Sequence, residues 1–554
     1  MAAGRKAALA ALRAVATECQ SVAAGFSDEE AAEGVAITVG LRALFQRPAS
    51  TSAAVAGLAA QPPELLTVVP TELLSIILSQ LDIRALACLA ATCRLLLCDA
   101  STPPLALPTP GLVETELRRR AEARGLHVGS SRPEGALSWV LYLLNCDFYD
   151  ALRREAPLAV GDDHSLFVDK EGRLHLSCLR EEIKAGGVGE PLLGHDWGSA
   201  AGAFLSVPPT LVPSMHDKRI ISVVSGPRHC LALGAEGEVY SWGNGSDGAL
   251  GHADGSESAG PRRIETLAHV ESVAAGFYTS AAVDDRGRLF TWGRAAFGGV
   301  EPTVLGYGWV EPTGLGYELG PVTECQLTPK RVDALSEDRV VGVALGRGFT
   351  LAVTDAGAVF SFGKNWFGEL GHGLSGLTTS EVLPRRIEAL AATGRRFVAV
   401  AAGDFHSLAL TEEGHVYRWG HGQANGHGQE QRTLQLVTAL AGVPVKLVYA
   451  QAISSCAVTE KGEPYTWRTG GPTIHLGHGV NTGQKTPKRV EALSGVKVAA
   501  VAICDKHTLV AGEDGVVWGF GDRGALGLGE ADAPSWANVV QPTPFPNIRM
   551  RTLP

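Results

Sequence analysis

The sequence lacks a hydrophobic run long enough to cross a membrane. In its 554 residues, no apolar stretch approaches the roughly 18 residues that a spanning helix needs. A basic surplus is also missing, since 48 Lys and Arg stand against 58 Asp and Glu, a formal net charge of −10. Because a nucleic-acid surface needs a basic face, we expect neither a membrane nor a nucleic acid as partner.

The ten cysteines lack the paired spacing of a disulfide framework. Cys88, Cys93 and Cys98 stand five residues apart in a segment that reads as helical, and no His/Cys pair has the spacing of a zinc site. This pattern is typical of free thiols in a reducing compartment. We therefore expect a cytoplasmic or nuclear protein, or one found in both, without a bound metal.

Motifs for catalysis are absent as well, because neither a P-loop nor a nucleophile elbow occurs. Residues 243–248 fit Gly-x-Gly-x-x-Gly and follow a predicted strand. The next residues, 249–255, cannot begin the helix whose N-terminus would hold a phosphate. We interpret this segment as a turn, and we expect no catalytic residue, no cofactor and no enzyme activity.

What the sequence has in excess is glycine, with 67 residues, many of them in a recurring hairpin. The clearest copy is residues 403–420, where one strand runs from Ser407 to Leu410 and another from Val416 to Trp419. Gly414 in the turn tolerates positive φ, and the return strand alternates aromatic residues at period two. This pattern predicts a tight antiparallel hairpin.

The hairpin occurs seven times. The turn glycines that mark the copies are Gly172, Gly237, Gly287, Gly357, Gly414, Gly462 and Gly515. Five residues after them stand Ser177, Trp242, Trp292, Phe362, Trp419, Trp467 and Phe520. Aromatics at the same position in successive copies predict packing between neighbouring sheets. Histidines that share one register, eight residues before the glycine, indicate bonding between strands; they are His164, His229, His406 and His507.

A repeat of about 50 residues indicates a solenoid or a propeller. These copies carry strand-like hairpins and glycine loops but no helical period long enough for helical-pair repeats. Repeated four-stranded antiparallel sheets close into a ring that leaves few exposed edges. The sequence thus predicts a mainly β protein with a seven-bladed β-propeller.

Two segments carry a resemblance to a known family. "VAAGDFHSLALTEEGHVYRWG" at 400–420 and "VYSWGNGSDGALGH" at 239–252 resemble the repeats of the regulator of chromosome condensation family. The resemblance runs from Leu158 to the C-terminus and implies a seven-bladed propeller over 158–554. Residues 539–550 resemble the inter-blade segment 384–390, and we expect this C-terminal strand to complete the blade that begins at Leu158.

Three segments precede the predicted propeller. Residues 1–60 form an alanine-rich leader in which Arg5, Lys6 and Arg13 precede the first acid, so both a weakly ordered leader and a transit peptide remain open. Residues 61–100 read as two short helices, and their leucines are too many for so small a segment to bury alone. Residues 101–157 contain a Pro-rich break and two further helical patterns, which we interpret as a bridge.

The helical segment 61–100 resembles an F-box, with Val69-Pro70, Glu72-Leu73-Leu74 and Cys93-Arg94 at the family's positions. It departs at Leu95–Leu97, where the family often has tryptophan. The resemblance implies an all-α module that docks on a Skp-type adaptor of a cullin ubiquitin ligase through Pro70, Leu73, Leu74, Ile77, Leu78, Leu81 and Leu86. The alternative is a helical hairpin that only packs on the propeller.

These resemblances together suggest a substrate-recognition subunit of a cullin-type ubiquitin ligase, with the propeller binding an unidentified target protein through its loops. The alternative is a guanine-nucleotide exchange factor or regulator of a small GTPase, as in some relatives of this propeller. The plant ultraviolet-B photoreceptor, another relative, has tryptophan after the first glycine of its blade segments. Here the matching segments at Gly161, Gly226, Gly276 and Gly403 have none, so we expect no light sensing.

A near duplication lies in the third copy, where residues 300–307 recur at 310–317. It lengthens a loop, and loop extensions on rigid scaffolds often carry binding sites. A tandem duplication without a role is the other interpretation.

Overall fold

The computed structural model describes Arg119 and residues 156–180, 205–294, 296–297, 311–312, 314–318, 325–373, 380–421, 431–468, 474–479, 483–528 and 539–550. The predicted leader, the F-box-like segment and almost all of the bridge lie outside these residues. Within the described part, no helix is long and apolar enough to cross a membrane.

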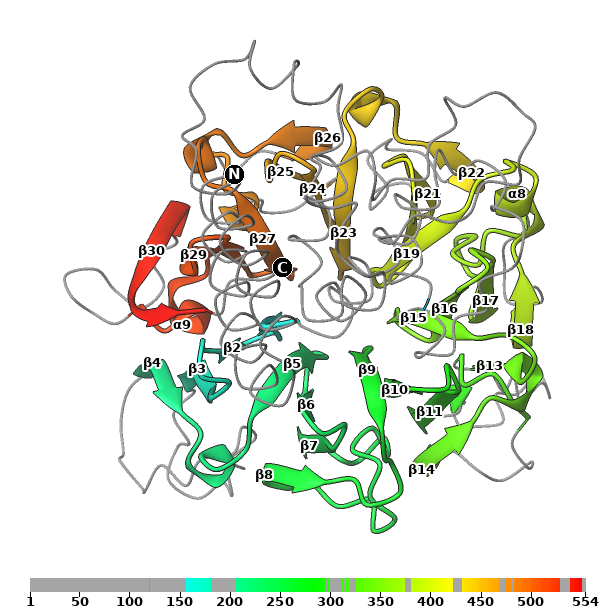
Figure 1. Ribbon diagram of the computed structural model, residues 1–554, viewed down its shortest axis with the longest axis horizontal. Coiled ribbons are helices and arrows are strands. Elements are labelled where there is room, and N and C mark those ends of the chain that lie inside the picture. The colour runs from blue at the N-terminus through cyan, green and yellow to red at the C-terminus, as the bar shows by residue number, and fades with distance from the viewer. Residues whose placement is uncertain are drawn as a thin grey trace, which may run out of the picture. The chain divides into compact units, whose positions relative to one another are not determined.

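Seven antiparallel sheets of four strands each are arranged as the blades of a ring (Figure 1). Blades one to three are β1 (Leu158–Val160), β2 (His164–Val168), β3 (Leu174–Arg180), β4 (Leu205–Leu211); β5 (Ile220–Ser225), β6 (His229–Gly234), β7 (Val239–Gly243), β8 (Ser258–Arg263); and β9 (Val270–Ala275), β10 (Thr279–Asp284), β11 (Leu289–Arg294), β14 (Cys325–Arg331). Blades four and five are β15 (Val340–Leu345), β16 (Phe349–Thr354), β17 (Val359–Gly363), β18 (Glu381–Arg386); and β19 (Phe397–Ala402), β20 (His406–Thr411), β21 (Val416–Gly420), β22 (Gln431–Leu436). Blades six and seven are β23 (Val445–Gln451), β24 (Ser454–Thr459), β25 (Pro464–Arg468), β26 (Gln484–Arg489); and β27 (Val498–Ile503), β28 (His507–Gly512), β29 (Val516–Gly521), β30 (Val539–Arg549). The predicted mainly β, seven-bladed propeller is confirmed.

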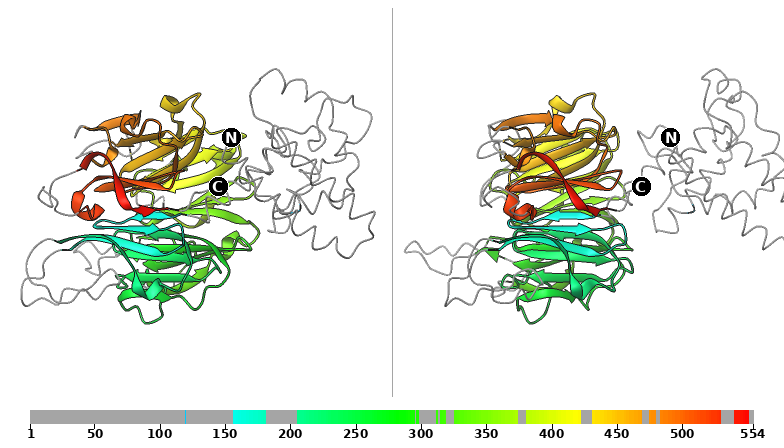
Figure 2. Two further views of the ribbon diagram at one scale, coloured as in Figure 1. Left: turned by 60° about the vertical axis from the view of Figure 1, so that its left-hand side comes forward. Right: turned by 90° about the vertical axis from the view of Figure 1, so that its left-hand side faces the viewer.

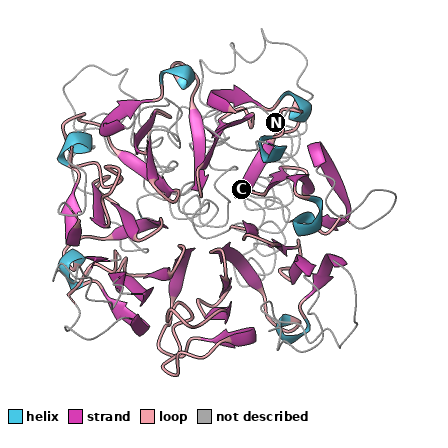
Figure 3. Ribbon diagram, turned by 180° about the vertical axis from the view of Figure 1, so that it is seen from behind, coloured by secondary structure: helices cyan, strands magenta, loops and turns pink. Residues whose placement is uncertain are grey.

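Each blade runs outward from the centre of the ring, where β5, β9, β15, β19, β23 and β27 lie (Figure 1). Short helices at the rim link several outer strands to the next inner strand, as Figure 3 shows from behind. They are η3 (Pro213–Met215), η4 (Asp333–Leu335), α8 (Glu388–Ala391), η6 (Thr438–Leu440) and η8 (Glu491–Leu493). Each buries one apolar side chain, such as Leu390 in α8, so the links also fill the space between blades.

The turn glycines explain why the hairpins form where the sequence predicts them. All seven have positive φ, between 73° and 83°, a region that side chains with a Cβ avoid. Six of these glycines also touch the next blade, whereas Gly515 touches Met550 after β30. At Gly414, an added Cβ would lie 2.7 Å from the backbone nitrogen of Val445, and Val445 donates a backbone hydrogen bond to the Gly414 carbonyl at 3.2 Å. Glycine is therefore needed both for the turn and for the approach of the neighbouring blade.

Apolar side chains between adjacent blades form the core. Trp292 of blade three packs with Leu231 and Val239 of blade two. Trp419 of blade five likewise packs with Leu351 and Val359 of blade four. The third-strand aromatics Trp242, Trp292, Phe362, Trp419, Trp467 and Phe520 are all at most 1% exposed. The sequence predicted that aromatics at this position pack between neighbouring sheets, and the structure places them between adjacent blades.

Closure of the ring differs from the expectation. β30 pairs with β29 and completes the seventh blade, whereas the first blade has its own four strands, β1–β4. The expected pairing of the C-terminal strand with the blade that begins at Leu158 is therefore wrong. The reason lies in the segment used for comparison, because residues 384–386 belong to β18, the outer strand of their own blade.

The seam between blades seven and one is instead closed by packing. In the side views of Figure 2, β30 (red) lies beside the first blade (cyan), and the two blades share one apolar cluster. In that cluster Phe545 of β30 meets Phe167 of β2 edge to face, with ring centroids 5.4 Å apart. An isolated bridge also joins Met550 to Asp169, in the turn between β2 and β3.

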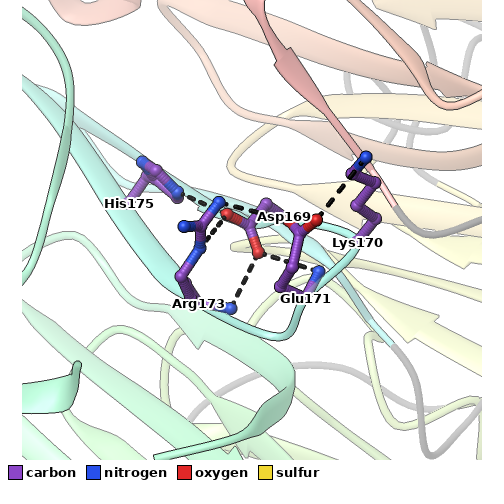
Figure 4. Close-up of polar contacts among 5 residues, drawn as sticks. All are labelled: Asp169, Lys170, Glu171, Arg173 and His175. Atoms are coloured by element: carbon purple, nitrogen blue, oxygen red, sulfur yellow. Dashed lines mark hydrogen bonds and ion pairs between the residues drawn. The ribbon is translucent and has the colours of Figure 1, made fainter. Parts of the chain in front are cut away.

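The turn at Asp169 is held by its own buried carboxylate (Figure 4). This group accepts hydrogen bonds from Nε of Arg173 at 2.8 Å, from Nε2 of His175 at 2.9 Å and from two backbone N–H groups, those of Glu171 and Arg173. Burial raises the pKa of Asp169, but the hydrogen bonds from His175 and Arg173 outweigh it and lower the pKa below its usual value. The cluster stabilises a turn of the seam.

The second copy of the near duplication, residues 310–317, contributes contacts to blade three. Glu311–Pro312 form β13, which pairs with β12 (Ala296–Phe297), while Thr291 donates to the Leu315 carbonyl and Thr350 to the Gly314 carbonyl, both at 2.6 Å. Ser241 of blade two donates in the same way to Leu250. The second copy thus supplies the ordinary loop of blade three, and the first copy, residues 300–307, lies outside the described residues.

Candidate functional site

The histidines in register connect neighbouring blades, as predicted. The Nε2 atom of His229 lies 2.9 Å from the Ser280 hydroxyl, and that hydroxyl donates to the Ala249 carbonyl at 2.7 Å. Since the hydroxyl has one proton to donate, Nε2 of His229 is the donor to Ser280. His406 bonds to Ser455, His507 to Ser165 and His164 to Ser225 at 2.7–2.8 Å. These side chains are committed to the fold and are not free for catalysis.

Burial keeps these histidines neutral. It lowers the pKa of His164 and His229 to about 4 and that of His406 and His507 to about 3. Three further histidines, His252, His372 and His478, bond to third-strand hydroxyls at 3.0 Å. The described histidines of both groups therefore serve as hydrogen-bonding links between strands and loops.

Of the described cysteines, Cys178, Cys230, Cys325, Cys456 and Cys504, none forms a disulfide bond. Burial raises the pKa of Cys230 and of Cys504 to about 12, so at neutral pH both remain protonated and unreactive. Among the described residues no cluster of His, Cys, Asp or Glu has a geometry that could hold a metal ion.

One face of the ring is formed by the turns at which the inner strands end. Because all seven blades share one strand order, the turns that follow their inner strands lie on the same face. We call these turns the turn ring: residues 161–163, 226–228, 276–278, 346–348, 403–405, 452–453 and 504–506. Neighbouring turns touch, since Arg347 donates its backbone N–H to Asp404 at 3.3 Å and Asp404 donates its own to Ala452 at 2.6 Å.

Blades six and one are linked by a side chain at the inner strands. Gln451, the last residue of β23, donates from Nε2 to the carbonyl of Val160, the last residue of β1, at 3.3 Å. The contact lies beside the turn ring, because both residues directly precede its turns.

Charged groups of both signs meet in the turn ring. Lys506 pairs with Asp163 at 2.5 Å across the seam, and Arg468 pairs with Asp505 at 3.0 Å. Burial raises the pKa of Asp404 to about 6; Arg347, 3.8 Å away, opposes this rise, while Asp505 and Asp162 add to it. Carboxylates from blades one, five and seven are thus close enough to disfavour one another's charge.

An aromatic row borders these carboxylates on blades three to five. The Arg347 guanidinium carbon lies 4.4 Å from the ring centroid of Phe277 and 5.8 Å from that of Phe405. Phe277 in turn contacts Tyr278, with centroids 4.4 Å apart, and Phe405 contacts Phe367 at 5.2 Å. These side chains are only half-buried, so ring faces and edges remain available on this surface.

The predicted site residues are found in different places. The seven adaptor-binding residues from Pro70 to Leu86 lie outside the described residues, and their role remains a prediction. The glycines and aromatics of the blades lie in turns and inter-blade cores. Sequence reasoning missed the aromatic row and the three carboxylates. The sequence did carry a signal for most of them, because they lie in the two positions that follow the first glycine of each copy. At those positions the sequence was searched for tryptophan alone.

Comparison with known proteins agrees with this geometry. The model of the RCC1-like domain matches residues 191–552, more than half of the chain. The human E3 ubiquitin-protein ligase HERC2 is 38% identical over 355 residues, which cover 62% of this chain and 7% of HERC2. The Ultraviolet-B receptor UVR8 of Arabidopsis thaliana is 31% identical over 342 residues, 60% of this chain and 69% of the receptor.

Solved structures show the same fold. Prp20p from Saccharomyces cerevisiae superposes with a TM-score of 0.53 at 21% identity, over 73% of this chain and 89% of that one. Human WBSCR16 gives a TM-score of 0.50 at 23% identity, over 64% and 86%. With a family model that spans six blades and part of the first, the chain belongs to the RCC1-like domain family.

Proposed function

We propose that this protein is the substrate-recognition subunit of a cullin-type ubiquitin ligase, in which the propeller binds a target protein through the turn ring. The observation that carries the proposal is the turn ring itself, a polar and aromatic face on a scaffold whose histidines in register, His164, His229, His406 and His507, bond to neighbouring blades. Such a face suits protein recognition. The proposal assigns the propeller no catalytic step and no cofactor.

The F-box-like segment supplies the link to the ligase in this proposal. Full burial of Leu73, Leu74, Ile77 and Leu78 against a Skp-type adaptor would contribute roughly 1.5–3 kcal/mol each, about 6–12 kcal/mol together. Association costs about 4–15 kcal/mol, so the other predicted contacts, among them Leu81 and Leu86, would have to add to these four. Two relatives of the propeller are named as ubiquitin ligases. Human HERC2 is named an E3 ubiquitin-protein ligase, and human HERC6 is named a probable one. The chain spans only 7% and 27% of those proteins, so the shared part is the propeller.

A double substitution tests the adaptor link. In the full-length chain, Leu74→Ala with Leu78→Ala should abolish co-purification with a co-expressed Skp-type adaptor, while the melting temperature of the propeller stays unchanged. The matched control is Leu95→Ala with Leu96→Ala, at the position where the segment departs from the F-box pattern. Equal adaptor binding by wild type and both variants, or no binding by wild type, would contradict the proposal.

A second candidate function is acceleration of nucleotide release from a small GTPase. It is favoured by the breadth of the turn ring, which suits a folded partner, and by the likeness to Prp20p, whose structure was reported with its binding to Gsp1p and histones. Release of a fluorescent nucleotide from small GTPases, with and without the full chain, separates the two functions. Faster release without any Skp-type binding would support this second function and contradict the first.

A further inference from the structure

One buried carboxylate belongs to a loop whose aromatic side chains reach the turn ring. Glu369 lies between β17 and β18 and is 1% exposed. Its two side-chain oxygens accept hydrogen bonds from two successive backbone N–H groups, Oε1 from Trp366 at 3.0 Å and Oε2 from Phe367 at 2.7 Å. We call residues 366–367 the aromatic tip. A single side chain thus holds the backbone of the tip.

The backbone of Glu369 is anchored separately from its side chain. Its carbonyl accepts hydrogen bonds from the Ser407 hydroxyl and from Nε1 of Trp419, both at 2.7 Å. In blade two the carbonyl of Ala249 receives the same two kinds of bond from blade three. The junction between blades therefore does not require a carboxylate at this position, and the side chain of Glu369 is available to hold the tip.

The two aromatic side chains of the tip have different surroundings. Trp366 is 36% exposed, and Nζ of Lys364 lies 4.3 Å from the centroid of its ring. Phe367 contacts Phe405 of the turn ring, with centroids 5.2 Å apart, and His421, with centroids 4.5 Å apart. A change in the backbone of the tip therefore changes one end of the aromatic row.

The protonation state of Glu369 determines how many tip bonds its side chain can accept. An ionised carboxylate accepts through both oxygens, whereas in a protonated carboxyl one oxygen carries the proton and becomes a donor. One of the two tip N–H groups then loses its acceptor, which is unfavourable in a buried place. Conversely, the two tip bonds lower the pKa of Glu369. By linkage, the bonded tip is favoured as pH rises and is loosened as pH falls.

Burial brings this protonation close to neutral pH. It raises the pKa of Glu369 to about 7, against the backbone N–H groups and Lys364, which lower it. Because the Glu369 carbonyl is anchored to blade five, the carboxyl stays buried whether the tip is bonded or loosened. The charged or titratable groups of the elements packed around this loop are Lys364, Arg347, Asp404, His406, Arg418 and His421.

We propose that Glu369 is a pH-sensitive switch: its ionised side chain holds the aromatic tip against the turn ring, and protonation releases the tip. The switch goes beyond the proposed function and does not depend on it, because it needs neither an adaptor nor a target protein. It makes the end of the aromatic row on blade four a surface whose shape depends on pH.

The test is fluorine NMR of the full-length chain labelled with fluorotryptophan, in which the signal lost in Trp366→Phe identifies Trp366. In the wild type this signal should titrate with a midpoint of about pH 7. Glu369→Gln, whose amide has a single acceptor oxygen, should keep the signal near its low-pH position throughout. The matched control is Glu388→Gln, at an exposed position of α8, which should titrate like the wild type.

Amide hydrogen exchange adds a second measurement. After correction for the intrinsic pH dependence of exchange, the tip amides should exchange about tenfold faster at about pH 6 than at about pH 8. Glu369→Ala removes both tip bonds and introduces the residue that blade two has at this position. Its tip amides should exchange fast at both pH values, and melting curves should show that Glu369→Ala and Glu369→Gln are folded.

Two further variants separate Glu369 from its titratable neighbours. Asp404→Asn and His421→Gln should leave the Trp366 midpoint where it is in the wild type. A Trp366 signal that stays constant between about pH 5.5 and 8.5 would overturn the proposal, as would an equal titration in Glu369→Gln. Loss of the titration in Asp404→Asn or His421→Gln would assign the pH dependence to that neighbour and also overturn it.

Discussion

Two kinds of junction hold the ring together, and they achieve the same contacts in different ways. Between blades four and five the chain is continuous through α8, and Phe397 donates its backbone N–H to the turn glycine Gly357 at 3.3 Å. Between blades seven and one the strands have no such link. There Met550 takes the place of the next inner strand and donates to Gly515 at 2.9 Å.

The side-chain contacts of the two junctions also correspond. Across an interior junction His406 bonds to Ser455 at 2.8 Å, and across the seam His507 bonds to Ser165 at 2.7 Å. The seam adds the aromatic pair of Phe545 and Phe167. The comparison teaches that blade packing, rather than the peptide link, decides the contacts at each junction, and that β30 carries much of the seam.

The largest expected effect follows from removal of residues 539–554. The deletion leaves the edge of β29 unpaired and takes Phe545 and Met550 out of the apolar cluster shared by blades one and seven. We expect a loss of more than about 5 kcal/mol in the free energy of unfolding, with aggregation, measured by calorimetry and light scattering. Deletion of residues 551–554 alone retains β30 and is the control. If both deletions melted like the intact chain, the seam would not depend on β30.

Next in size is truncation of one large aromatic at each junction. Trp419, at an interior junction, is fully buried and Phe545, at the seam, is 2% exposed. Trp419→Ala and Phe545→Ala should each cost about 3–5 kcal/mol in denaturant melts. Trp366→Ala, at a residue that is 36% exposed, should stay within about 0.5 kcal/mol. A Phe545 loss below about 1 kcal/mol, beside a full Trp419 loss, would show that the seam is looser than the interior junctions.

The smallest expected effect, counted per pH unit, is the loss of stability in acid caused by the buried histidines. The folded pKa of His406 and of His507 is about 3, whereas the unfolded value is about 6.5. Between these values the unfolded chain binds more protons, so stability falls as pH falls from about 6.5, by up to about 1.4 kcal/mol per pH unit per histidine. Denaturant melts at several pH values measure the slope. His406→Gln and His507→Gln should reduce it equally; a flat wild-type profile would contradict neutral burial of both.

Sequence patterns were sufficient for every feature that lies within one hairpin. The turn at Gly414 requires positive φ, and the aromatic five residues later stands at a fixed strand position, so both follow from local geometry. The number of blades follows from repetition of that unit. The shared position of the histidines also predicted their bonds between strands, because residues at the same position of similar blades have similar neighbours.

Tertiary structure alone decided how the ends of the ring meet and what gathers on its face. β30 could pair with either of two blades by its residues, and the choice depends on contacts between distant segments rather than on local pattern. His164 meets two partners on the next blade, the Ser225 hydroxyl at 2.7 Å and the Cys230 thiol at 3.1 Å. Cys230 stands at the position where Ser280, Ser455 and Ser165 receive the other histidines. Asp162 precedes Asp404 by 242 residues and Asp505 by 343 residues. Only closure of the ring places the three residues on the same face.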